Sequence, residues 1–599
     1  MSLVDLRVVS SMLSFLRTVL AVFVGLFVFL VFVVAGLAAL VPAGQNAAQL
    51  PDDIVLYVDL RTQFVDGPVE DPFFLAGGGA SSIVNLVQAL ARAEDDPRVS
   101  GVYLRAGGVP LPMSQAQEIH EALTAFKAQD KFVIAHAQGF FGTGLGTYHA
   151  ASAADEIWMQ PNGLVNTSGL ALESLFFTGL LDKLGITPDL EQFYEYKGAA
   201  DALTETAYTE AQRQTLGRLL QSAYEQSVGT IAASRNLSGD VLVGRMANAP
   251  LLGKEALDAQ FVDRLGYDDD AEFAALDRAG LFSEILDWRD YFAIAGSPYT
   301  EGPSVALIYG EGAIHEGESD FSQFGSGATS MGGDTLSRAL REAADDADVQ
   351  AILFRVNSPG GSVIASDQIW DAVNYAKEAG KPVVISMGDV AASGGYYVSM
   401  SADKIIANPT TITGSIGVVS GKFVVSEALA NLGITTDRIV VGTDNTLVFS
   451  PTETFNEAQR EALLRSMEQV YTDFVGKVAA GRGLDASVMD DLARGRVWTG
   501  SDAKDRGLVD EVGGFRTAIA AVRDVAGLEE DADITLEVFP APLTPFERLA
   551  STLGVSAQGL RMLGTLAAVF DTRQVDAARD VLINRSQGAD ASIDPMTVY

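Results

Sequence analysis

The sequence predicts an α/β protein in which two tandem copies of one large domain follow a single N-terminal transmembrane helix. Three observations predict this fold class: an internal repeat with a period of about 250 residues, β-rich runs that alternate with helical patterns in both copies, and a long uncharged apolar run near the N-terminus. Strands that alternate with helices favour α/β layers joined by right-handed crossovers.

The repeat is visible in short matched segments that keep an almost constant spacing. Residues 183–187 (Lys-Leu-Gly-Ile-Thr) match residues 431–435 (Asn-Leu-Gly-Ile-Thr), and residues 210–213 match residues 457–460, which are Glu-Ala-Gln-Arg in both copies. The offsets are 248 and 247 residues. Solenoid repeats have periods of roughly 20–50 residues, so this period indicates duplication of a whole domain.

Each copy has the same predicted order of elements. Strands are expected at residues 54–58, 102–105, 132–136, 305–309, 351–356 and 383–386, and helices at residues 115–127 and 366–376. The segment 295–303 contains Gly and Pro and is the predicted boundary between the copies. We therefore assign residues 49–298 to the first copy and 299–540 to the second. Residues 541–599 have helical apolar spacing and are predicted to be an amphipathic extension that packs on a domain or a partner.

The N-terminal 48 residues are predicted to be a membrane anchor with a short cytoplasmic end. Residues 18–51 contain no charged side chain, and this run exceeds the ~20 residues that cross a bilayer. The apolar region of a signal peptide would be shorter, about 7–15 residues. Two arginines precede the run and two aspartates follow it, which favours a cytoplasmic N-terminus. In a bacterium, the remaining chain would then lie in the periplasm.

Composition excludes several classes of function. The formal net charge is -37 and the pI is about 4.3, which argues against a nucleic-acid partner because phosphates need a basic surface. The chain has no cysteine, so disulfides, thiol catalysis and thiolate-bound metals are excluded. The four histidines have no metal-ligand spacing, and no metal site is predicted: they are His120, His136, His149 and His315.

Three glycine-rich motifs in the second copy suit acyl-transfer chemistry. They are residues 357–361 (Asn-Ser-Pro-Gly-Gly), 391–397 (Ala-Ala-Ser-Gly-Gly-Tyr-Tyr) and 413–417 (Thr-Gly-Ser-Ile-Gly). A serine that opens a helix after a strand presents its hydroxyl beside backbone N–H groups that can stabilise an oxyanion. This makes Ser393 a candidate nucleophile, with Gly394 and either Gly360 or Gly361 as candidate oxyanion donors. A tightly packed turn without a catalytic role could have the same sequence.

The base for this serine must come from elsewhere in the chain. Neither a G-x-S-x-G nor an S-x-x-K signature surrounds Ser393, and no histidine lies near it in the sequence. The three motifs, together with Tyr196 and Lys197 in the first copy, resemble the long, duplicated form of signal peptide peptidase A (protease IV) up to about residue 540. The resemblance implies a Ser-Lys dyad in which Ser393 is the nucleophile and Lys197 the general base, while Ser415 orients the lysine amine.

The resemblance also implies the wider function. It implies tandem crotonase-like repeats of the kind found in Clp-type proteases, and a membrane-anchored endopeptidase of the bacterial inner membrane. Such an enzyme would hydrolyse remnant signal peptides and other flexible apolar peptides through an acyl-enzyme, without a metal or organic cofactor, as a homotetramer. Two alternatives stay open: a crotonase-like acyl-CoA hydratase or hydrolase, and a catalytically idle membrane scaffold.

The alignment of the two copies divides the dyad between them. At the offset of 248 residues Ser393 falls on Leu145, which has no hydroxyl, and Lys197 falls on Asn445, which cannot act as an amine base. A gap of two residues would bring Thr143 to the serine position, but the partner lysine would still be missing. One active site for each pair of repeats is therefore expected. The family resemblance favours a site formed within a single chain, and a site formed between neighbouring subunits is the alternative that stays open.

Lys197 must meet a physical condition to act as a base. Its ordinary pKa of about 10.4 has to fall to roughly 7–8, and burial in an apolar cleft would lower it. A nearby carboxylate would oppose this change. Glu195, two residues earlier, is therefore expected to point away from the amine, and a contact between them would contradict the dyad.

Overall fold

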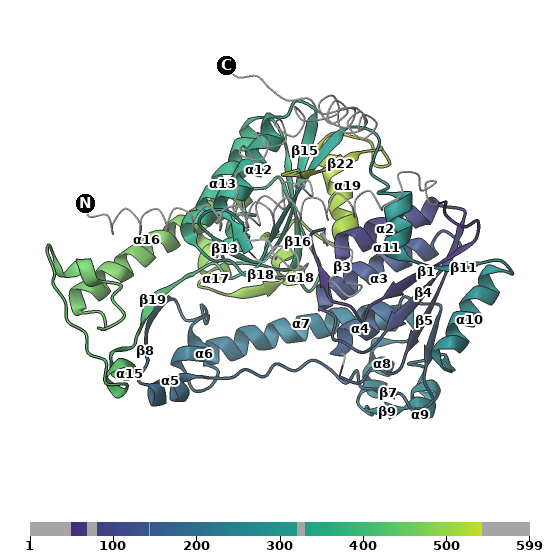
Figure 1. The fold of residues 1–599 in the computed structure, drawn as a ribbon, viewed down its shortest axis with the longest axis horizontal. Coiled ribbons are helices and arrows are strands. Elements are labelled where there is room, and N and C mark those ends of the chain that lie inside the picture. The colour runs from purple at the N-terminus through teal and green to yellow at the C-terminus, as the bar shows by residue number, and fades with distance from the viewer. Residues whose placement is uncertain (1–48, 69–80, 143, 320–329, 542–599) are drawn as a thin grey trace, which may run out of the picture.

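The computed structural model describes residues 49–68, 81–142, 144–319 and 330–541, which form two large sheets with helices packed around them (Figure 1). Each copy of the repeat forms one of the two large sheets, and among the described residues four two-stranded sheets lie outside them. The first sheet, in purple and blue, lies at the lower right of Figure 1, and the second lies above it. The tandem α/β organisation predicted from the sequence is confirmed.

The first sheet is parallel throughout, with the strand order β11-β1-β4-β5-β6-β10. Its strands are β1 (Ile54–Asp59), β4 (Val99–Ala106), β5 (Phe132–Ala137), β6 (Glu156–Met159), β10 (Arg264–Leu265) and β11 (Glu284–Asp287). Strands β1, β4 and β5 are buried along most of their length, as expected for a parallel sheet covered on both faces. Its helices include α2 (Ile83–Asp95), α3 (Met113–Lys127), α4 (Gly144–Ala151), α7 (Glu210–Ser234), α8 (Gly239–Met246), α9 (Gly253–Asp258), α10 (Asp268–Ala279) and α11 (Trp288–Ala295).

The second sheet repeats this order as β22-β12-β15-β16-β17-β21, and β18 and β20 extend it from the end of β16. Its strands are β12 (Ser304–Glu311), β15 (Val349–Ser358), β16 (Val383–Ala392), β17 (Lys404–Ala407), β18 (Ile412–Gly414), β20 (Val497–Thr499), β21 (Glu511–Val512) and β22 (Thr535–Phe539). Only β20 runs antiparallel to its neighbour in the described sheet. The helices include α12 (Gly333–Asp345), α13 (Val363–Glu378), α14 (Gly394–Tyr397), α16 (Glu457–Arg482), α17 (Met489–Leu492), α18 (Gly500–Lys504) and α19 (Phe515–Val525).

Every predicted strand and both predicted helices lie within observed elements. Helix α13 begins earlier than the predicted residue 366, because the Ser362 side chain accepts a hydrogen bond from the Ala365 N–H and caps the helix at that point. The predicted anchor and the predicted extension lie outside the described residues, apart from residue 541. Among the described residues, no helix is both long and apolar enough to cross a bilayer.

A strand pair and a helix are among the elements that join the copies. Strand β8 (Thr187–Phe193) of the first copy pairs antiparallel with β19 (Val418–Val424) of the second, away from both large sheets. Helix α19 of the second copy buries Phe515, Ile519 and Val522 in the apolar core that is centred on the first sheet. The apolar core is thus continuous across the junction, which holds residues of the two copies in fixed relative positions.

A buried network of charged groups also spans the junction. The Arg355 guanidinium on β15 donates to Asp66 at 2.6 Å and to Glu118 at 2.8 Å, and all three side chains are almost completely buried. Two further carboxyl groups lie close by. Burial, followed by the charge of Asp66, raises the pKa of Glu311 to about 7 and that of Asp389 to about 6. Near neutral pH, the network is therefore poised to gain or lose protons.

The Glu311→Gln variant is expected to be more stable than the parent at pH 8, by on the order of 3 kcal/mol. The folded-state pKa of Glu311 is raised from 4.5 to about 7, so the stability that its proton provides is complete below about pH 4.5 and is lost as pH rises through 7. Glutamine keeps the neutral form at every pH. Thermal unfolding between pH 5 and pH 8 measures the difference.

The exposed Glu537 on the neighbouring strand β22 offers a matched control, and Glu537→Gln should leave the pH dependence unchanged. A stability gain for Glu311→Gln that is equal at pH 5 and pH 8 would contradict the assignment.

Candidate functional site

Ser393 lies at the end of β16, where the chain turns sharply into the short helix α14. Its backbone has φ 54° and ψ -116°, a conformation that costs a non-glycine residue about 1–3 kcal/mol. The Ser393 N–H donates to the Gly414 carbonyl at 2.9 Å, and the Ser393 carbonyl accepts from the Tyr397 N–H. Ser393 is partly exposed, whereas Ala392 and Gly394 on either side are buried. The turn therefore presents one hydroxyl to solvent on a rigid backbone.

Lys197 reaches this serine through the strand pair that joins the copies. The β8–β19 register ends with Phe193 opposite Val418, so the chain after β8 runs beside the chain before β19. Lys197 is not on the strand itself, because Tyr194 has a φ of 76° and turns the chain. This turn delivers the lysine side chain to Ser415, which has a φ of 52°.

The Lys197 amine makes three short contacts. Its Nζ lies 2.9 Å from Ser393 Oγ, 2.9 Å from Ser415 Oγ and 2.8 Å from the Ser415 carbonyl oxygen. A neutral amine has two N–H donors and one lone pair. If both donors are directed to Ser415, the lone pair faces the Ser393 hydroxyl. The structure thus brings together the three side chains that the sequence singled out from opposite copies.

Burial keeps Lys197 away from other charges. Its relative exposure is 4%, and desolvation alone lowers its pKa to about 8. Glu195 points away from the amine, as expected, and its carboxylate pairs with Arg494 at 2.9 Å. The pKa of Lys197 therefore meets the condition for a base that is partly neutral near pH 7–8.

The candidate oxyanion glycines lie in close contact around Ser393. The Gly360 N–H donates to Ser358 Oγ at 3.1 Å, so this amide is already engaged. Gly394 is the first residue of α14, and its N–H has no partner within the helix. A Cβ on Gly394 would lie 3.2 Å from the Gly361 nitrogen, so the two amides are neighbours. Gly361 and Gly394 are consequently better placed than Gly360 to share an oxyanion.

The corresponding positions in the first copy do not form a second site. Leu145 is buried in α4, the counterpart of α14, and Asn445 lies in a short 3-10 helix at residues 444–447. Thr143 lies outside the described residues. Within the described chain, Lys197 and Ser393 therefore form a single dyad.

Two glycines, Gly417 and Gly495, pack closely against Lys197. A Cβ on Gly417 would lie 3.1 Å from Lys197 Cδ. A Cβ on Gly495 would lie only 2.4 Å from the backbone nitrogen of Lys197. Gly417 belongs to the motif at residues 413–417, but its contact with the lysine was not predicted. Gly495 lies between two arginines and belongs to no motif, so sequence reasoning missed it.

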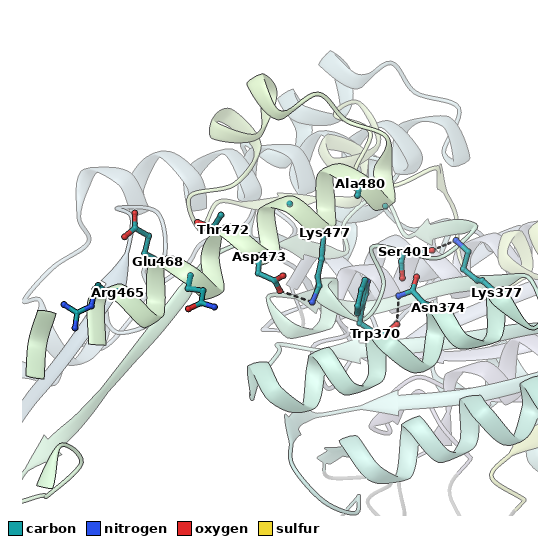
Figure 2. A pocket seen from close by; sticks show the side chains of 13 residues that line it. Trp370, Asn374, Lys377, Ser401, Arg465, Glu468, Thr472, Asp473, Lys477 and Ala480 are labelled. Atoms are coloured by element: carbon teal, nitrogen blue, oxygen red, sulfur yellow. Dashed lines mark hydrogen bonds and ion pairs between the residues drawn. The ribbon is translucent and has the colours of Figure 1, made fainter. Parts of the chain in front are cut away.

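A cavity of about 1220 Å³ lies away from the dyad, between α13 and α16 (Figure 2). Trp370, Asp473 and Lys477 line it, and Lys477 Nζ lies 2.9 Å from the Asp473 carboxylate. Lys477 also donates to the Tyr397 hydroxyl at 2.7 Å, four residues after Ser393. Neither Ser393 nor Lys197 lines the cavity.

Comparison with known proteins agrees with this geometry. The model of peptidase family S49 matches residues 125–281 and 375–529, once in each copy. Protease 4 of Salmonella typhi is 32% identical over 529 residues, which cover 84% of this chain and 83% of the relative. The chloroplastic serine protease SPPA of Arabidopsis thaliana is 27% identical over 547 residues, which cover 89% and 79%.

A shorter relative and a solved structure are more distant. The putative signal peptide peptidase SppA of Enterococcus faecium is 34% identical over 184 residues, which are 31% of this chain and 53% of that protein. A ClpP1 mutant from Listeria monocytogenes aligns with a TM-score of 0.24 and 16% identity, covering 36% of this chain and 94% of that one.

Proposed function

The chain belongs to peptidase family S49 and is a serine peptidase, and from this premise we propose that Ser393 is its nucleophile and Lys197 its general base. The observation that carries the assignment is the 2.9 Å contact between a buried amine without a charged partner and a partly exposed serine hydroxyl. Neither residue is functional alone, because a serine hydroxyl needs a base to become a nucleophile.

The proposed reaction follows from these contacts. Ser393 Oγ attacks the peptide carbonyl while its proton passes to the Lys197 lone pair, and the Gly361 and Gly394 N–H groups stabilise the oxyanion. The Lys197 ammonium then protonates the leaving amine. A water molecule then attacks the acyl-enzyme while the neutral amine accepts its proton, and the lysine passes this proton to Ser393 Oγ as the acid product leaves. Ser415 keeps the amine oriented through both halves.

The proposed substrates are remnant signal peptides and other flexible apolar peptides. A relative that bears the name putative signal peptide peptidase supports this class. We further propose a crotonase-like fold of the Clp-protease kind for each copy, supported by the parallel sheets and the helix that follows the nucleophile strand. The uncharged run at residues 18–51 supports a bacterial inner-membrane anchor with a cytoplasmic N-terminus.

Cleavage of an apolar signal-like peptide by the full chain in detergent tests the assignment. Wild-type protein should cleave the peptide, and Ser393→Ala should reduce the rate to background without changing thermal stability by more than about 1 kcal/mol. An inactive wild-type protein would favour the idle scaffold, and cleavage by Ser393→Ala at the parent rate would remove the serine from the mechanism.

We also propose that the chain assembles into a homotetramer, and internal symmetry supports this. The β8–β19 pair joins a segment of the first copy to one of the second. The repeat offset maps β8 onto residues 435–441 and β19 onto residues 170–176, and neither segment has a strand partner among the described residues. Both expose apolar side chains: Leu175 is 71% exposed and Ile439 97%. Pairing them between neighbouring chains would give a head-to-tail interface, and such an interface forms a closed ring when the rotation from chain to chain is a whole fraction of a turn, a quarter turn for a tetramer.

A second pair of residues supports the same interface. Arg218 on α7 binds Asp502 of the second copy at 2.7 Å, and the offset of 247 residues maps this pair onto Arg465 and Glu255. Arg465 is 70% exposed, and its only ion pair among the described residues is a 3.9 Å contact with Glu461. The expected partner of Arg465 is therefore Glu255 of the next chain.

Charge reversal tests this interface. Arg465→Glu should lower the molar mass of the detergent-solubilised protein, measured by light scattering, and adding Glu255→Arg should restore the larger assembly. A parent chain that is already monomeric, or a double variant no larger than the single one, would contradict the proposed ring.

A further inference from the structure

A loop of the second copy contacts both Ser415 and Lys197. Residues 493–496 connect α17 to β20. The Gly495 N–H donates to the Ile416 carbonyl at 2.8 Å, and the Arg496 carbonyl accepts from the Ser415 N–H at 2.7 Å. Gly495 also packs directly on the Lys197 backbone. This loop therefore fixes Ser415 and Lys197 relative to each other.

Arg494, the neighbour of Gly495, binds the residues just before the lysine. Its guanidinium lies 2.9 Å from the Glu195 carboxylate and 3.2 Å from Asp490, and it stacks over the Tyr194 ring with 4.7 Å to the ring centre. Arg494 has a φ of 61°, and its N–H donates to the Tyr471 hydroxyl at 3.2 Å. Contacts on both main chain and side chain thus hold this arginine in place.

From this arrangement we infer that Arg494 is a positioning residue that holds the Glu195 carboxylate away from the Lys197 amine, so that the buried amine stays without a charged partner. The inference rests on the proposed role of Lys197. The turn at Tyr194 takes Glu195 off strand β8, so no strand pairing fixes its direction. The ion pair with Arg494, which also binds Asp490, fixes it instead.

Releasing Glu195 would change the chemistry of the base. A carboxylate within about 4–6 Å of an amine favours the ammonium form, which cannot accept the serine proton. In the folded chain the Lys197 pKa is lowered by burial alone, and no carboxylate opposes it. The charged and titratable groups that face this region are Arg494, Arg496, Asp490, Glu195, Tyr194, Tyr196 and Tyr471.

The test is the pH dependence of kcat/KM for four proteins: the parent, Arg494→Ala, Glu195→Gln and the double variant. Arg494→Ala should shift the acid limb of the kcat/KM profile to higher pH by about one unit. At pH 7 this is a roughly tenfold loss of kcat/KM, and the loss disappears at high pH. Glu195→Gln alone should keep the parental limb. The double variant should return to the parental limb, because an amide cannot hold the proton on the lysine.

A merely structural role for Arg494 would give a different pattern. It would lower kcat at every pH, and Glu195→Gln would not restore it. Either that pattern or an unshifted limb in Arg494→Ala would overturn the inference. Failure of the proposed dyad would give a different result. In that case the acid limb of the parent would not depend on Lys197, and Lys197→Met would not remove it.

Discussion

Lys197→Met is expected to lower kcat/KM for an apolar peptide by about 10³–10⁴-fold, since it removes the base that activates the serine. Methionine has a similar length and suits the buried channel beside Gly417, so the fold should survive. For the parent, activity should rise with pH and level off above about pH 8, where the amine is neutral. Steady-state kinetics across pH 6–10 measure both effects.

The same variant should be more stable than the parent at neutral pH. Burial depresses the folded-state pKa of Lys197 from 10.5 to about 8, so the unfolded chain binds the proton more tightly between these values. The stability of the parent therefore rises with pH over this range, and removing the group should add on the order of 3 kcal/mol at pH 7. This gain should vanish by about pH 10.5.

Exposed Lys183 on α5 (Thr178–Leu184) provides the control, and Lys183→Met should change neither the rate nor the pH profile. A Lys197→Met protein that retains more than about a tenth of the parental rate would rule out the general-base role, because such a base supplies at least about a hundredfold.

Much of the fold could be predicted because its signals are local. Strands β1, β4 and β5 are runs of buried apolar residues, and the short motifs that carry the family resemblance singled out Ser393 and Lys197. The turn at Ser393 was recognisable because glycines follow it directly, where a backbone must approach closely. These features depend on neighbours in the sequence.

The remaining features depend on contacts between distant segments. The β8–β19 pair links residues more than 200 positions apart, and nothing in either strand identifies its partner. The buried Arg355 could not be recognised as a junction residue, because its partners Asp66 and Glu118 lie in the other copy. Arg494 and Gly495 were missed for the same reason. Their sequence shows an exposed, charged loop, and only the position of Lys197 gives them a role.

Gly495→Ala is expected to reduce kcat by about a hundredfold. The added Cβ would lie 2.4 Å from the backbone nitrogen of Lys197 and 2.5 Å from its Cα, so the backbone that carries the lysine must move. A displacement of about 1 Å at a reacting group costs on the order of 10²-fold in rate. The Lys197 amine cannot compensate by rotation, because its short contacts to Ser393 and Ser415 are fixed from the second copy.

The backbone strain of this substitution can be separated from the steric effect. Gly495 has a φ of 86°, so alanine there also adopts an unfavourable left-handed conformation, at about 1–2 kcal/mol. Gly483, which ends α16, has a φ of 62° and no atom within 4 Å of an added Cβ. Gly483→Ala should therefore lose similar stability in thermal unfolding but keep the parental kcat. Equal loss of activity in both variants would mean that strain, rather than displacement of Lys197, limits catalysis.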